Sequence, residues 1–96
     1  MKVFIFDLLA YGHHFEDYKR EKHIPYPLPR EHFDPEIGAR TYEQHLDAWA
    51  EMDRLGFDGV GLNEHHTTPH GMMNSPNMMA AVGAQHTKNL KFLLLG

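Results

Sequence analysis

The residues best suited to chemistry lie together in one stretch, residues 63–71, which reads Asn-Glu-His-His-Thr-Thr-Pro-His-Gly. Glu64 stands directly before His65, and a carboxylate beside an imidazole can fix the tautomer of the ring. Adjacent residues point in different directions, so the sequence does not require these two side chains to touch. Catalysis by Glu64 and His65 is one interpretation of the stretch.

Two other interpretations of residues 63–71 stay open. In the first, the histidines only hydrogen-bond backbone groups within a structural loop. In the second, they bind a metal ion, to which the histidine pair at 13–14 could contribute. A metal is the less favoured of the two because these histidines lack a recognised ligand spacing and the His-Glu-x-x-His helix motif is absent. We therefore predict no metal site.

Three apolar stretches, residues 2–8, 59–63 and 90–96, are predicted to be strands. The first and third are almost continuously apolar, which is typical of parallel strands buried on both faces. Residues 63–71 begin where the second predicted strand ends. Because the carboxyl ends of parallel strands converge on one crevice, polar side chains there are candidates for catalysis.

Two helices are predicted between these strands. The first opens at Thr41, where Gln44 gives the spacing of a capping box, and it stops at Gly56. The second opens with Ser75 as its N-cap and Pro76 in its first turn. Methionines 72, 73, 78 and 79 lie in or near this second helix and are expected to fill the core rather than to line a pocket.

A long loop is predicted over residues 10–40, which are rich in His, Tyr and Pro and show no sustained periodicity. Its proline-rich run at 24–29 has little freedom to be helical. Loops of this length in compact proteins usually cover or bind a ligand, or else are disordered. A cover over a substrate and a mobile insertion are equally compatible with this sequence.

The alternation of predicted strands and helices indicates an α/β protein with parallel strands and right-handed crossovers. Two helices cannot cover both faces of a three-stranded sheet. We therefore expect residues 1–96 to be the N-terminal portion, about three βα units, of a (β/α)8 TIM barrel, which typically needs about 250 residues.

Composition excludes several classes of partner. The chain carries 9 Lys and Arg against 13 Asp and Glu, a formal net charge of −4, and lacks the clustered positive charge that binds phosphates. We expect no nucleic-acid partner. No apolar run approaches the roughly 20 residues of a membrane span, so no membrane partner is expected either. The absence of cysteine fits a cytoplasmic protein.

Two segments together resemble a known family. Residues 55–66 read Leu-Gly-Phe-Asp-Gly-Val-Gly-Leu-Asn-Glu-His-His, and residues 74–77 read Asn-Ser-Pro-Asn. This pattern resembles the luciferase-like flavin-dependent monooxygenases, the superfamily of bacterial luciferase. The resemblance extends from about residue 42 to residue 96, whereas the long loop departs from luciferase itself.

The resemblance implies a barrel enzyme that uses reduced FMN and molecular oxygen to oxygenate a small organic substrate. It further implies a separate flavin reductase as a partner, a possible homo- or heterodimer, and no activity of this segment alone. In the family motif the functional histidine falls on His65 and the acid on Glu64. The residues implied to lie near the flavin are Asn63, His66, Leu95 and Gly96.

Three rival functions remain. A deazaflavin-dependent oxidoreductase of the same superfamily would transfer hydride without oxygen. A non-catalytic flavin-binding protein or truncated barrel would bind the cofactor without turnover. A histidine-rich metal-binding module is the most distant alternative.

Overall fold

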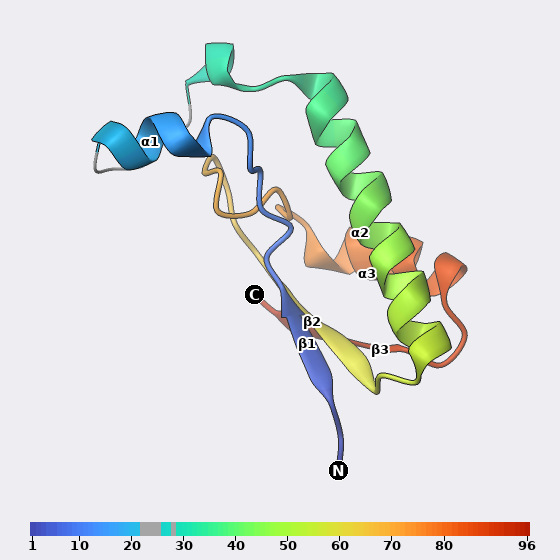
Figure 1. Ribbon diagram of the computed structural model, residues 1–96. Helices are drawn as coiled ribbons and strands as arrows, with labels where there is room; N and C mark the ends of the chain where they lie inside the picture. The colour runs from blue at the N-terminus through green and yellow to red at the C-terminus, as the bar shows by residue number, and fades with distance from the viewer. Residues whose placement is uncertain (22–25, 28) are drawn as a thin grey trace.

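The computed structural model describes residues 1–21, 26–27 and 29–96. Strands and helices alternate along most of the chain (Figure 1), so the predicted α/β class is confirmed. The elements in chain order are β1 (Phe4–Asp7), α1 (Phe15–Glu21), the short 3-10 helix η1 (Arg30–His32), α2 (Pro35–Leu55), β2 (Gly59–Asn63), α3 (Pro76–His86) and β3 (Lys91–Leu95).

The three strands form one parallel sheet in the order β1-β2-β3, so β2 is central. Helices α2 and α3 pack on the same face of this sheet, as the usual right-handed crossovers between parallel strands in this order require. Trp49 of α2 meets Phe92 of β3 edge to face, with ring centroids 5.6 Å apart. A Cβ on Gly83 of α3 would lie only 2.6 Å from the Phe92 ring. The helices therefore pack tightly on this face.

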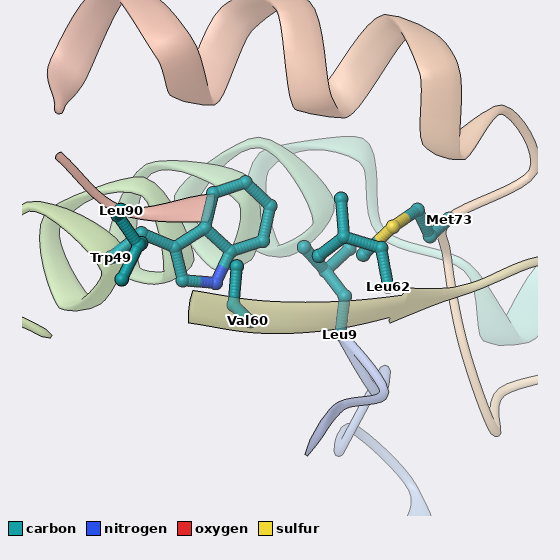
Figure 2. Close-up of a cluster of buried hydrophobic side chains, with 6 residues drawn as sticks. All are labelled: Leu9, Trp49, Val60, Leu62, Met73 and Leu90. Atoms are coloured by element: carbon teal, nitrogen blue, oxygen red, sulfur yellow. The ribbon is translucent and has the colours of Figure 1, made fainter. Parts of the chain in front are cut away.

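The hydrophobic core lies between the helices and the sheet. Every residue of β2 is buried, and Val60 and Leu62 point from it toward the helices. Figure 2 shows these two side chains with the other buried members of the core cluster, Leu9, Trp49, Met73 and Leu90. Leu9 and Met73 lie in the loops after β1 and β2, so the core extends to the carboxyl edge of the sheet.

The opposite face of the sheet is apolar and open. Phe4 and Phe6 of β1 and Leu93 and Leu95 of β3 alternate along their strands and are each about half exposed. The expectation that the first and third strands are buried on both faces is therefore wrong for this chain. Helices α2 and α3 lie on one side of the sheet, and only the central strand, β2, is buried along its whole length.

The start of α2 differs from the prediction. The helix begins at Pro35 and not at Thr41, because Asp34 caps it with a side chain that accepts from the N–H groups of Glu36 and Ile37. Thr41 instead lies inside the helix and donates from its hydroxyl to the Ile37 carbonyl at 2.8 Å. Within the described ranges no helix is both long and apolar enough to cross a bilayer.

The predicted loop 10–40 contains helical structure. It includes α1, η1 and the first turns of α2, so its description as a segment without elements is wrong. These elements are short or strongly polar, which removes the apolar periodicity that predicts a helix. Of the proline-rich run 24–29, residues 24, 25 and 28 lie outside the described residues.

A buried carboxylate joins β1 to α2. Asp7, the last residue of β1, has a side chain only 10% exposed. It accepts hydrogen bonds from His45 Nδ1 and Trp49 Nε1, each at 2.7 Å, and from the Leu9 N–H at 2.8 Å. Burial alone would raise the pKa of Asp7, but the bonds from His45, Leu9 and Trp49 outweigh it and hold the pKa below its ordinary value.

We expect Asp7→Asn to lower the free energy of unfolding at neutral pH by about 1–3 kcal/mol, because it removes the charge that these donors surround. The depressed folded pKa means that the carboxylate stabilises the fold fully above its unfolded pKa of about 3.9. That contribution is lost as the pH falls through the folded value. Urea unfolding from about pH 2 to pH 6 should show the gap between the two proteins shrinking toward acid. A gap independent of pH would contradict this role for Asp7.

Candidate active site

Backbone hydrogen bonds fasten the loop after β1 to the loop after β2. Tyr11 N–H donates to the Pro69 carbonyl and Met72 N–H to the Leu9 carbonyl, each at 2.9 Å. The second loop also closes on itself, because His65 N–H donates to the Met73 carbonyl at 3.0 Å. Residues 63–71 are thus held at the carboxyl edge of the sheet, where the sequence places them.

Asn63 and His65 form a pair at this edge. Asn63 ends β2 and is only 4% exposed, and its side-chain Nδ2 lies 3.0 Å from His65 Nδ1. A Cβ on Gly71 would lie 2.8 Å from His65 Nδ1 and 2.7 Å from the Leu8 carbonyl oxygen. Only glycine at position 71 therefore lets the loop lie this close to the pair.

Glu64 and His66 form a second, exposed pair. Glu64 Oε1 lies 2.8 Å from His66 Nε2, so the acid of the predicted site contacts His66 rather than His65. Glu64 also reaches the end of β3, where a Cβ on Gly96 would lie 2.7 Å from Glu64 Oε2. Leu95, the last residue of β3, stands beside Asn63 in the parallel register. The candidate residues thus gather at the ends of two neighbouring strands.

A cavity of about 220 Å³ opens beside His65. Two tyrosine rings form part of its wall, and their hydroxyls are engaged elsewhere: Tyr11 donates to the His32 carbonyl, and Tyr42 donates to the Met72 carbonyl. Burial raises the pKa of Tyr42 above its ordinary value, which keeps this hydroxyl a donor. The full lining is Tyr11, Phe33, Tyr42, His65, Thr67, Thr68, Gly71, Met72 and Asn74.

Sequence reasoning missed the aromatic wall of this cavity. Tyr11 and Phe33 come from the predicted loop 10–40, and Tyr42 comes from α2, where its helical spacing indicates a core position. The only available signal is the richness of the loop in aromatic residues. The structure places two residues of that loop, Tyr11 and Phe33, on the wall of the cavity.

The methionines divide between core and surface. Met73 is fully buried in the core cluster and Met79 packs against it, as predicted. Met72 also packs against the core, yet it lines the cavity as well. Met78 is 70% exposed, so the prediction that it fills the core is wrong.

Several other histidines of the described residues have partners of their own. His14 Nδ1 lies 3.0 Å from Asp17 Oδ2, and its ring stacks on that of His32 with centroids 5.0 Å apart. His70 Nδ1 lies 2.9 Å from the Thr68 hydroxyl. In the part of the chain that the structure describes, no three His, Asp or Glu side chains are placed to hold a metal ion.

Gly71→Ala is expected to destabilise the protein by about 1–3 kcal/mol, because the new methyl group would force the backbone loop away from Leu8 and His65. Gly12→Ala is the matched control, since nothing lies within 4 Å of a Cβ at that position. Urea unfolding of both variants measures the difference. Equal stability of the two would show that the loop yields without cost.

The parallel strands and the helices between them define an α/β protein, and its cavity beside His65 lies at the carboxyl ends of the strands, where such proteins generally bind ligands. The family model of the luciferase-like monooxygenases matches residues 23–94, and the chain belongs to this family. It is a family of oxidoreductases that generally uses flavin-type cofactors.

The uncharacterized protein y4wF of Sinorhizobium fredii (strain NBRC 101917 / NGR234) is 43% identical to this chain over 53 residues. The match covers 55% of this chain and 16% of that protein, so it spans a small part of the relative's length. No solved structure gives a significant match.

Proposed function

We propose that the chain forms part of a flavin-dependent monooxygenase that uses reduced FMN and molecular oxygen to oxygenate a small organic substrate. One observation carries the proposal beyond family membership. His65 lines a cavity at the carboxyl edge of the sheet, and its ring is fixed there by a buried neighbour. A fixed imidazole at such a position can pass a proton to or from a bound molecule.

The open face of the sheet supports the wider architecture of a (β/α)8 barrel. In such a barrel the helices lie outside and the inward strand faces pack against one another. Here α2 and α3 share one face, and the other presents the half-exposed side chains of Phe4, Phe6, Leu93 and Leu95. We propose that this apolar face is the barrel interior and that residues 1–96 supply its N-terminal portion.

The residues at the strand ends fit a flavin. A flavin ring needs an apolar surface and hydrogen-bonding groups at its edge. Leu95 offers half-exposed apolar surface, and buried Asn63 Oδ1 has no hydrogen-bond partner among the described residues. Leu95, Gly96, Asn63 and His66 are the proposed contacts. When bound, reduced FMN would supply the electrons that activate oxygen.

The cavity favours an uncharged substrate. Its lining, taken over the described residues, contains no Lys, Arg, Asp or Glu. The two tyrosine hydroxyls are already bonded, so their rings contribute mainly apolar surface. Among the described lining residues, Thr67, Asn74 and His65 can still hydrogen-bond a polar group of the substrate. We therefore expect aldehydes or alkanes to be accepted and sulfonates to be rejected.

Oxygen uptake by the native-length protein tests the proposal. A flavin reductase would supply reduced FMN, and aldehydes, alkanes and sulfonates would be tried in turn. Substrate-dependent uptake, with one atom of labelled oxygen in the product, supports a monooxygenase. Hydride transfer to a deazaflavin without oxygen would support the oxidoreductase alternative. Tight flavin binding with neither reaction would support the non-catalytic flavin-binding alternative.

The same proposal includes a separate flavin reductase as a partner, a dimeric state and a cytoplasmic location.

A further inference from the structure

The pairing of Asn63 with His65 determines more than the position of the imidazole. Asn63 is 4% exposed at the end of a strand buried along its whole length, so its side chain has little freedom to move. Its Nδ2 is an amide nitrogen, which only donates, and it lies 3.0 Å from His65 Nδ1. A donor at this distance requires Nδ1 to be the acceptor, which leaves the proton of the neutral ring on Nε2.

We propose that Asn63 is a positioning residue that holds His65 in the tautomer protonated at Nε2. The surroundings of Nδ1 agree with this assignment. The loop backbone at Gly71 comes so close that a Cβ there would lie 2.8 Å from Nδ1 and 3.3 Å from Asn63 Nδ2. Asn63 and Gly71 therefore close the Nδ1 edge of the ring, and no ligand reaches that nitrogen.

The opposite ring nitrogen is the one left for a ligand. His65 lines the cavity, and within the described ranges Nε2 has no hydrogen-bond partner. With its proton on Nε2, the neutral imidazole meets a bound molecule as a hydrogen-bond donor. In this neutral form it serves as a hydrogen-bond donor from Nε2 toward an oxygen atom of the ligand and cannot act as a base through that nitrogen. This consequence rests on the proposed function, whereas the tautomer rests on the contacts alone.

The amide group of Asn63 gives the proposal a clear alternative. Turned by 180°, the amide would accept from a proton on His65 Nδ1 through Oδ1 and would leave Nδ2 unpaired in a buried place. In the observed orientation the unpaired buried atom is Oδ1. A carbonyl oxygen without a partner is more readily tolerated than an N–H group without one. The observed orientation is thus the better one, and the two orientations predict opposite tautomers.

Nitrogen NMR of the full chain with 15N-labelled histidine tests the assignment at about pH 9, where an ordinary imidazole is neutral. The resonances of His65 are identified as those lost in His65→Gln. We expect Nδ1 to be pyridine-like and Nε2 pyrrole-like. Asn63→Asp replaces the donor with a group that only accepts, so the two patterns should exchange. Asn63→Leu removes the bond and should give a mixture of both tautomers.

Asn77→Asp is the matched control, because it makes the same chemical change at an exposed position on α3 and should leave the His65 resonances unchanged. A proton on Nδ1 in the unmodified chain would overturn the proposal, and that spectrum decides the question even if a variant fails to fold. An Asn63→Asp protein that is folded by circular dichroism, with the original pattern, would overturn it too. This experiment does not measure oxygen uptake. The proposed function can therefore fail while the tautomer assignment stands, and the tautomer assignment can fail while the proposed function stands.

Discussion

His65→Ala is expected to leave flavin binding nearly intact and to lower turnover by about two to four orders of magnitude, the usual contribution of a positioned acid or base. The imidazole lies at the wall of the cavity, fixed by Asn63, and alanine cannot carry a proton. The measurement is substrate-dependent oxygen uptake by the native-length protein supplied with reduced FMN. Flavin affinity is determined in parallel from the change in flavin fluorescence.

A matched histidine in the same loop controls for disturbance of the loop itself. His70 is exposed and, as far as the described residues go, does not line the cavity and bonds only to Thr68. His70→Ala should retain most of the turnover. Unchanged turnover in His65→Ala would remove His65 from the mechanism. An equal loss in both variants would assign the effect to loop structure and not to the imidazole.

The side chains at the candidate site pair in the alternating pattern of an extended strand. Side chains two residues apart in an extended strand share a face. β2 ends at Asn63, and the same alternation continues in the residues that follow, where Asn63 meets His65 and Glu64 meets His66. The sequence contains this alternation, because the second strand is correctly predicted to end at Asn63, directly before the candidate residues. The sequence accordingly does not require Glu64 and His65 to touch, but it does not name their partners, which the structure identifies as His66 and Asn63.

Other features depend on contacts between distant residues. The aromatic wall of the cavity combines Tyr11, Phe33 and Tyr42 from a loop and a helix, and no local pattern brings them together. The start of α2 is a different case, because Asp34 and Pro35 form a visible N-cap and first turn. Its first turns carry only one large apolar side chain, Ile37, so the apolar periodicity points to a later start at Thr41.

Trp49→Ala is expected to lower the free energy of unfolding by about 3–5 kcal/mol, the typical cost of removing a large buried aromatic side chain. The Trp49 side chain is fully buried, packs on Phe92 and donates its indole N–H to Asp7. It thus links α2 to β1 and β3 at once. Total stabilities of small domains are about 5–15 kcal/mol, so this change removes a large share. Urea unfolding followed by circular dichroism is the measurement, because Trp49 is the chain's only tryptophan and the variant has no indole fluorescence.

Trp49→Phe separates packing from hydrogen bonding at this position. Phenylalanine keeps an aromatic ring against Phe92 but removes the N–H that Asp7 accepts. We expect it to cost about 1–3 kcal/mol, less than alanine, because the Asp7 carboxylate keeps its bonds from His45 and Leu9. Leu55→Ala, at an exposed position near the end of the same helix, should change stability by less than about 0.5 kcal/mol. If alanine and phenylalanine at position 49 cost the same, the bond to Asp7 carries the effect and the ring packing contributes little. If phenylalanine costs no more than Leu55→Ala, the packing of α2 on the sheet is what holds the core together.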